Sequence, residues 1–415
     1  MVEVPGAQAG GLTLRAGPAR LLADPPGAAV LAVCAAVLGL RRAEAWSNPQ
    51  FWAEDGHFYE RAHVIGWRAL ALPYNGYLHT VPRLVAALAD SFDPALAPGI
   101  FVGCATLLTL YVASRALSRR CPLPRFAGCC ALAVALVPNT GEVLLNIVNI
   151  QWVLAGALVL LLISGDPKGP GQWAHDAVSA AAIGLTGPFC IILAPLFAWR
   201  AWDRGTRASA LLCAVVVACA LVQGRLVATL PSGVDGSPGD PVLAGLMLPA
   251  IARAVGCSLL MGSLAPGSLG QAAGTILGAA TLLGAGWLAS MRGALRRERA
   301  VLGLVFAAAL AGSLYRTRHS MPQYFLPHSM SRYVYLPQLV AIWLLLSCAA
   351  RGGRAGRVAA ALAAAGFLAN VPRYREPAYV DMHWGLYAPL IRAGEAVTVP
   401  INPPGWKMPL PARGK

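Results

Sequence analysis

Charged residues are scarce in this chain of 415 residues, and lysine is almost missing: 12% of the residues are charged, and the lysines are Lys168, Lys407 and Lys415. So low a charge content excludes an ordinary soluble domain, in which about a quarter of the residues are charged. A cysteine pattern suited to a metal is also missing, because most of the ten cysteines lie inside apolar runs, where a thiol behaves as a small hydrophobic group. We expect no cleavable signal peptide, since no small-residue site follows the first apolar run.

Apolar sequence is abundant, with 57% hydrophobic residues and a mean hydropathy of +0.59. A first strongly apolar segment covers residues 27–40, and runs long enough to cross ~30 Å of hydrocarbon recur after it. These runs include residues 94–117, 150–164, 209–222, 270–291 and 333–350. The sequence therefore predicts one all-α, polytopic membrane unit whose irregular parts are confined to loops.

Arginine supplies nearly all of the positive charge, and 33 basic against 18 acidic residues give a net charge of +15. That balance would suit a nucleic-acid partner, but the arginines cluster in short loops at the ends of the apolar runs, where the positive-inside rule places them. We therefore expect no nucleic acid to bind. The clusters lie at residues 115–125, 200–207, 292–299 and 351–357, and all four should face the cytoplasm.

The chain between the first two clusters must then cross the membrane an even number of times. Residues 126–138 and 150–164 form one pair, and residues 176–199 must supply two short helices, because Gly187-Pro188 breaks a helix. Such a break survives in lipid where protein or a wet cavity covers the freed backbone groups. Arg41 and Arg42 oppose this topology, because they fall on the outer side.

The expected fold is therefore a bundle of about 11 transmembrane helices, some of them short or broken. It has a cytoplasmic tail over residues 1–26, a transmembrane domain over 27–370 and an extracytoplasmic tail over 371–415. The loops with chemically interesting residues all fall on the outer side: residues 41–93, 139–149, 223–268 and 316–332, and the tail.

Glu54 and Asp55 form an acidic pair in the string FWAEDGHFY, in the loop that follows the first apolar run. Adjacent carboxylates can hold Mg²⁺ or Mn²⁺, or take a proton from an attacking hydroxyl. The structural alternative is a helix cap: Asp55 can begin a helix whose apolar face, Phe58, Ala62, Ile65 and Ala69, lies flat at the membrane interface. Both readings are compatible, and spacing alone leaves them about equal.

Basic side chains on the outer side are candidates for binding a phosphate. Arg83 can grip a phosphate through its planar guanidinium, although an arginine at the interface more often only snorkels. The loop 316–332 adds Arg316, Arg318, His328 and Arg332. The positive-inside rule disfavours basic residues on the outer side, so their presence there suggests an anionic ligand such as a lipid phosphate. Contact with lipid headgroups is the alternative.

Amide, acidic and aromatic side chains at the outer mouths of the spans are candidates for binding a sugar or an acceptor. These are His57, His79, Glu142, Asn146, Asn149, Trp152, Trp384 and Trp406. Hydrogen bonds between helices would explain the amides equally well, and an aromatic belt would explain the tryptophans.

These features together resemble the polyprenyl-phosphate-dependent glycosyltransferases of the GT-C superfamily. The resemblance rests on FWAEDGHFY and the helix behind it, on the break at LTGPF, on NIVNIQW, and on RYVYLP at the start of a late span. It covers nearly the whole chain in layout and is specific at the acidic motif. It implies that residues 27–370 are a GT-C-like transmembrane domain and that Glu54 or Asp55 is the base or metal-linked carboxylate. Many members carry a sizeable soluble outer domain, and its absence here leaves the acceptor open.

The resemblance implies an enzyme at the outer face of a bacterial cytoplasmic membrane. It would move a sugar from polyprenyl phosphate to a cell-envelope glycan or glycolipid, with the outer arginines stabilising the departing phosphate. Mg²⁺ or Mn²⁺ is an open expectation. The alternatives are a polysaccharide polymerase or ligase with the same donor, a lipid-linked sugar transporter or flippase favoured by the helix break, and a non-catalytic membrane scaffold.

Overall fold

The computed structural model describes residues 25–138, 141–230, 241–262, 270–326 and 329–413. It is 72% helical, and its strands form two short antiparallel hairpins, β1–β2 and β3–β4. The predicted all-α class is confirmed.

Within the described residues, six helices are long and apolar enough to cross a membrane. They are η3 with α5 (Pro94–Ala116), α10 (Arg207–Thr229), α14 (Gln271–Ser290), α15 (Arg296–Arg316), α16 (Ser331–Ala349), and α17 with η8 (Gly353–Arg373). Shorter apolar helices accompany them: α1 (Pro25–Arg41), α6 (Ala127–Leu136) and α7 (Ile150–Ile163). A helical membrane protein is thus supported, whereas the count of about 11 crossings stays a prediction.

The apolar core lies around α7 and α16. All residues of α7 are buried, and 78% of the apolar window of α16 is buried, against 17% for α14 and 22% each for α10 and α17. Side chains of the peripheral helices therefore remain available to lipid, while α7 and α16 pack against protein on every side.

The helix break predicted within residues 176–199 is confirmed. α8 (Pro170–Gly184) and α9 (Phe189–Arg204) meet at a turn in which Gly187 has a φ of +91°. A Cβ at Gly187 would lie 2.8 Å from Gln151 Oε1, so both the left-handed backbone and the close approach require glycine. The turn is covered by protein, as a break in lipid requires.

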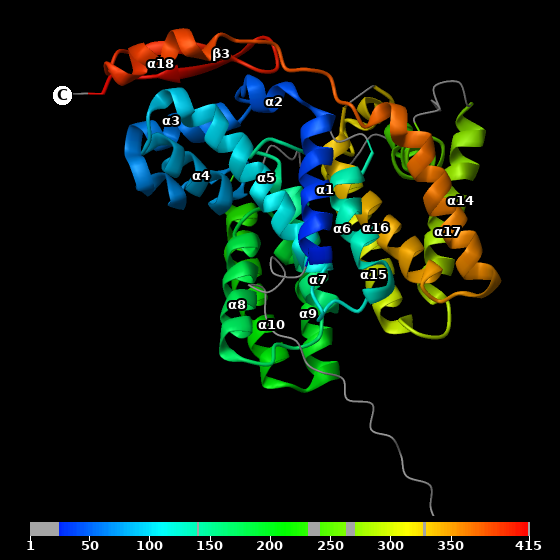
Figure 1. The fold of residues 1–415 in the computed structure, drawn as a ribbon. Helices are drawn as coiled ribbons and strands as arrows, with labels where there is room; N and C mark the ends of the chain where they lie inside the picture. The colour runs from blue at the N-terminus through cyan, green and yellow to red at the C-terminus, as the bar shows by residue number, and fades with distance from the viewer. Residues whose placement is uncertain (1–24, 139–140, 231–240, 263–269, 327–328, 414–415) are drawn as a thin grey trace, which may run out of the picture.

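A second layer covers one end of the helical bundle (Figure 1). It combines the segment after α1 with the C-terminal tail, and both contribute to one hydrophobic core that includes Phe51, Phe58, Trp384, Ile401 and Met408. Its elements are α2 (Glu44–Ser47), α3 (Asp55–Ile65), η2 (Gly66–Ala71), β1 (Pro73–Tyr74), β2 (Tyr77–Leu78), α4 (Thr80–Asp90), α18 (Trp384–Arg392), β3 (Val397–Ile401) and β4 (Trp406–Leu410). The C-terminal tail thus packs onto this end of the bundle, and whether this end is extracytoplasmic stays a prediction.

The helix expected to lie at the membrane interface is present as α3, but its apolar face is not free for lipid. Phe58 and Ala62 are fully buried and Ala69 is 1% exposed, because the β3–β4 hairpin and α4 cover them. Ile65 alone of the four expected residues is exposed, at 38%. The apolar spacing was correctly identified, but it serves the core of the second layer.

Arg41 and Arg42, which oppose the predicted topology, are buried and partnered. Arg41 Nη2 lies 2.8 Å from Glu376 Oε1 of the tail, and its Nη1 donates to two carbonyls at the end of α6. The Arg42 guanidinium lies 4.0 Å from the centroid of the Tyr379 ring. The two arginines hold the tail to α1, so they carry little weight as loop charges.

The loop predicted over residues 223–268 contains helical segments that the sequence did not reveal. They are α11 (Pro241–Ala244), α12 (Met247–Ile251), a π-helical turn η5 (Ala252–Cys257) and α13 (Ser258–Met261). Residues Met247–Met261 form an apolar segment that packs on α14 and α17. This part of the chain is thus integrated into the bundle instead of forming a free outer loop.

The four basic clusters lie together at the end of the bundle opposite the second layer (Figure 1). Arg297 forms an ion pair with Asp203, which joins the second and third clusters. Arg125 Nη1 donates to Ala350 O at 3.2 Å, which joins the first and fourth. Their placement on one side is confirmed; which face of the membrane this is stays a prediction.

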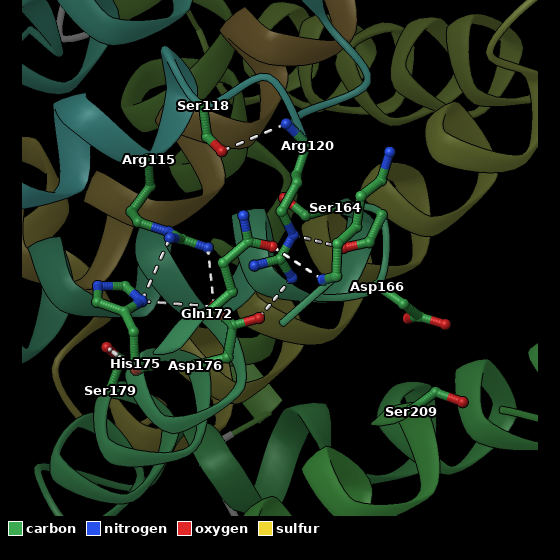
Figure 2. A network of polar contacts seen from close by, with 12 residues as sticks. Arg115, Ser118, Arg120, Ser164, Asp166, Gln172, His175, Asp176, Ser179 and Ser209 are labelled. Carbon is green, nitrogen blue, oxygen red and sulfur yellow. Dashed lines mark hydrogen bonds and ion pairs between the residues drawn. The ribbon is translucent and has the colours of Figure 1, made fainter. Parts of the chain in front are cut away.

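Ion pairs close the bundle at this basic end (Figure 2). Asp176 on α8 lies 3.3 Å from Arg115 Nη2 and also pairs with Arg120. Asp166 accepts hydrogen bonds from Arg200 at 2.7 Å and Arg204 at 2.8 Å. These two carboxylates pair with the four arginines that fasten α8, α9 and α10 to the ends of α5 and α7.

Candidate functional site

Asp55 begins α3, and its carboxylate is turned into the protein. The side chain is 1% exposed, and its Oδ1 accepts a hydrogen bond of 2.7 Å from Val148 N in the loop 141–149. Burial raises the pKa of Asp55 well above its ordinary value, and the neighbouring charge of Glu54 adds to the rise. Asp55 therefore joins α3 to the loop and is not open to a substrate.

Glu54 precedes the helix and lies on a different side, partly exposed. The pKa of Tyr74 is raised first by burial and second by the charge of Glu54, so the carboxylate lies near the Tyr74 ring. Glu54 also lies within electrostatic range of Arg332 at the start of α16. Glu142 Oε1 is 3.7 Å from Arg332 Nη1. The Arg332 guanidinium thus pairs with Glu142 and lies within electrostatic range of Glu54, and the region around these three residues is here called the mouth of the bundle.

Three basic side chains, here called the basic cluster, lie beside Tyr74: His79 and Arg83, which are buried, and His57, whose side chain is 30% exposed. His57 packs on the Tyr74 ring at 4.7 Å, and the Arg83 guanidinium lies 5.1 Å from the Phe58 ring. His79 is 3% exposed and Arg83 is 1% exposed. Within the described residues, neither ring nitrogen of His79 and neither Nε nor Nη1 of Arg83 has a hydrogen-bond partner.

Within the described residues, His57 Nδ1 lies 3.8 Å from Glu60 Oε2, whereas His79 and Arg83 form no ion pair. Burial, followed by the charge of Arg83, lowers the pKa of His57 to about 4 and that of His79 to about 3. Burial, followed by Arg61, lowers the pKa of Arg83 to about 10. Buried polar groups are almost always partnered in folded proteins. Given these pKa values, both imidazoles are uncharged at neutral pH and Arg83 carries the charge. Its Nε–H and Nη1–H groups, together with the N–H of His79, are buried donors that an anion would satisfy.

The backbone that carries His79 is held by the helix break and by Gln223 of α10. Gln223 is fully buried; its Oε1 accepts from Leu78 N at 2.8 Å, and its Nε2 donates to Leu78 O at 3.2 Å and to Gly187 O at 3.3 Å. Val81 N donates to Thr186 Oγ1 at 3.0 Å. One side chain thus satisfies both the broken helix and the strand that precedes His79, which fixes the basic cluster against the bundle.

The expected sugar-binding amides have a structural partner instead. Asn146 and Asn149 are 2% and 4% exposed, and both side-chain amides donate to Glu142 O, at 2.8 and 2.6 Å. They shape the loop that presents Glu142 and the Val148 amide. Of this group, Glu142 lies at the mouth of the bundle, and the two asparagines position it.

The three tryptophans predicted to bind a sugar lie in different parts of the structure. Trp152 is 8% exposed and packs edge-on against Phe189 and Tyr333, beside the mouth. Trp384 packs in the core of the second layer, where its Nε1 donates to Pro94 O at 2.9 Å, so neither face of its ring is free for a sugar. Trp406 is 43% exposed at the start of β4, on the tail.

The basic residues predicted to bind phosphate in the loop 316–332 also lie in different surroundings. Arg332 lies at the mouth, as described above, and Arg316 lies within electrostatic range of Tyr77. Arg318 is buried, donates to Tyr315 O and stacks over the Tyr315 ring at 4.4 Å. His328 lies outside the described residues.

A divalent cation does not fit the acidic pair. Asp55 is buried and uses one carboxyl oxygen on a backbone amide, whereas the Glu54 side chain lies on a different side, near Tyr74 and within electrostatic range of Arg332. Within the described residues, no group of three or more His, Cys, Asp or Glu side chains is suited to a metal. No step is therefore routed through a metal below.

Residues that sequence reasoning missed include Tyr74, Tyr77 and Gln223. A glutamine inside an apolar run is a signal that could have identified Gln223, since polar side chains within a membrane span tend to be functional or to bond another helix. The two tyrosines have no comparable signal, because aromatics are common at the membrane interface.

The site at the mouth thus brings together Glu54, Glu142 and Arg332, with the basic cluster directly behind. Two small cavities of about 10 Å³ each, room for one water, lie at the basic end and not beside Glu54. Comparisons with protein-family models, with curated proteins and with solved structures found no significant match.

Proposed function

We propose that this protein is a membrane glycosyltransferase that moves a sugar from a polyprenyl-phosphate donor to a cell-envelope glycan or glycolipid. One observation carries the proposal, at one end of an apolar bundle: a partly exposed carboxylate, Glu54, lies near Tyr74, and on the other side of that ring the buried polar atoms of His79 and Arg83 lack hydrogen-bond partners within the described residues. A phosphate linked to a lipid would satisfy the basic cluster, and a sugar between phosphate and carboxylate would stand at the mouth.

The chemical step is a single displacement. Glu54 takes the proton of the acceptor hydroxyl, whose oxygen forms a bond to the anomeric carbon while the bond from that carbon to the phosphate oxygen breaks. The phosphate leaves with the bonding electron pair and gains negative charge, which Arg83 and Arg332 stabilise. Fixed charges of this kind often supply the largest part of a rate enhancement. Inversion at the anomeric carbon follows from one displacement.

Asp55 and Gln223 act through other groups in this proposal. Asp55 holds the Val148 amide and thereby the loop that presents Glu142, and Gln223 holds the backbone before His79. Both are positioning residues and touch neither substrate.

The proposal includes a placement in a bacterial cytoplasmic membrane. The basic end would face the cytoplasm, as the positive-inside rule expects, and the second layer would face outward. The predicted set of about 11 membrane crossings would consist of the six long helices together with α1, α6, α7, α8 and α9.

A transporter or flippase is supported less well, although the helix break first suggested one. The backbone groups at the break bond to Leu78, Thr80 and Gln223, so they are not left for a substrate. A polymerase or ligase would share the donor and the basic cluster and would differ in the size of the acceptor.

The test compares two neighbouring carboxylates. Glu54→Gln should lower turnover of a polyprenyl-phosphate sugar at least about 100-fold, whereas Asp55→Asn, which keeps an oxygen for the Val148 amide, should lower it far less. Glu395→Gln, on the exposed tail, is the matched control. Reconstituted membranes report turnover, and size-exclusion chromatography reports folding. Full turnover by folded Glu54→Gln protein would remove the base from the proposal.

A further inference from the structure

The basic end is divided into a partly neutralised part and an unneutralised part. Beside α8 and α9, Asp166, Asp176 and Asp203 pair with arginines of the first three clusters. Five arginines on that side thus have a carboxylate partner, and within the described residues Arg119 and Arg207 do not. The sequence does not reveal which arginines have an acidic partner, because all four clusters have a similar composition.

The unneutralised part is here called the arginine face. It consists of Arg125, Arg292, Arg296, Arg351, Arg354 and Arg357, all exposed. Within the described residues, none of the six forms an ion pair with an acidic side chain.

Three loops bring the arginine face together. The turns before α6, between α14 and α15, and between α16 and α17 share one small core, with Phe126, Met291, Cys348, Ala349 and Ala359. Arg125 Nη1 donates to Ala350 O at 3.2 Å, and Arg351 Nε lies 3.4 Å from where a side chain at Gly293 would begin. The loops are therefore neighbours in space, and their charges add.

Lipid-facing surface continues directly from the arginine face. Trp287 on α14 is 56% exposed and Val358 on α17 is 50% exposed, each within two turns of an arginine of the face. An exposed apolar side chain can contact the acyl chain of a phospholipid, and a neighbouring guanidinium can contact its phosphate. A guanidinium also fits phosphate oxygens through two parallel hydrogen bonds.

We propose that the arginine face binds the headgroups of anionic phospholipids in the adjoining leaflet. This role is separate from the proposed glycosyl transfer, whose residues lie at the other end of the bundle. The bound lipids would supply the counter-charge that the protein itself does not provide on this side.

The experiment titrates the purified full-length protein, in detergent, with phosphatidylglycerol or phosphatidylcholine and counts bound lipids by native mass spectrometry at low and high ionic strength. The wild-type protein should prefer phosphatidylglycerol, and the preference should shrink as salt screens the exposed charges. The double variant Arg351→Gln, Arg354→Gln should bind phosphatidylglycerol about 25-fold more weakly, since each basic side chain near an anionic surface contributes about fivefold.

Arg119→Gln with Arg207→Gln is the matched control, because both arginines are exposed outside the arginine face. An equal loss in this control, or equal binding of the two lipids by the wild-type protein, would overturn the proposal. So would tighter binding of a DNA oligonucleotide than of phosphatidylglycerol. If the double variant does not fold, the wild-type measurements decide alone. A preference for phosphatidylglycerol over phosphatidylcholine that high salt abolishes supports the proposal, and a preference that persists at high salt contradicts it.

Discussion

Replacement of Arg83 by methionine distinguishes a binding role from a structural one. Arg83 is 1% exposed and lacks partners at Nε and Nη1 within the described residues, and burial lowers its pKa from 12.5 to about 10. A shift of that size corresponds to roughly 3 kcal/mol. Solvent screening and the contact with Phe58 reduce the net cost of the buried charge to roughly 1–2 kcal/mol.

Methionine keeps the apolar stem and removes the charge, so the ligand-free variant should unfold at the same temperature as the wild-type protein or at a higher one. Inorganic phosphate or polyprenyl phosphate should raise the unfolding midpoint of the wild-type protein in detergent and leave that of Arg83→Met unchanged. Glycosyl transfer should fall roughly 100- to 1000-fold, the usual effect of removing one group that stabilises developing negative charge.

Arg299→Met is the matched control, because Arg299 is fully buried and has partners. Its Nη1 and Nη2 donate to Ala294 O at 2.6 Å and to Met291 O at 2.7 Å. Loss of those bonds should destabilise the protein by roughly 2 kcal/mol or more. If Arg83→Met is destabilised as much as this control and still responds to phosphate, then Arg83 is a structural residue and the basic cluster is not a binding site.

Three further predictions concern other parts of the molecule. Gln223→Leu should raise the KM for the lipid-linked donor more than it lowers kcat, because the backbone at Leu78 loses its anchor; steady-state kinetics measure the two separately, and an unchanged KM would contradict a positioning role. His79 is kept neutral in the folded protein by a pKa of about 3, whereas the unfolded chain takes up a proton below 6.5, so stability is complete above pH 6.5 and falls on acidification. The loss should reach about 2 kcal/mol between pH 7 and pH 5, and thermal unfolding of His79→Gln should lack that part of the pH dependence. A reporter fused at Gly205, in the turn between α9 and α10, should read cytoplasmic, and an outside reading would reverse the proposed orientation.

Features that depend on neighbouring residues could be predicted from the sequence. Apolar run length identified the long helices, Gly187-Pro188 identified the helix break, and clustered arginines identified one end of the bundle. In each case the cause lies within a few residues of its effect: a proline removes a backbone donor where it stands, and a run of apolar side chains avoids water as a unit.

Contacts between distant segments could not be predicted. The partner of Asp55 is the amide of Val148, and the partner of Leu78 is Gln223, 145 residues away. Trp384 and the asparagines at 146 and 149 carried plausible sugar-binding chemistry, yet packing and hydrogen bonding give them structural roles. A side chain's chemistry limits what it can do, and its neighbours decide which of these roles remains open.

The sequence by itself determined that this protein is a helical membrane protein with a broken helix, with its basic loops gathered at one end and an acidic pair in the segment after its first apolar helix. Local hydrophobicity and backbone restrictions are sufficient for those features. Tertiary structure decided that Asp55 is buried while Glu54 lies within electrostatic range of Arg332, and that His79 and Arg83 are buried with polar atoms that have no hydrogen-bond partner within the described residues. Burial and the distance between charges arise when segments far apart in the chain pack together, and they set which carboxylate and which arginine remain available to a ligand.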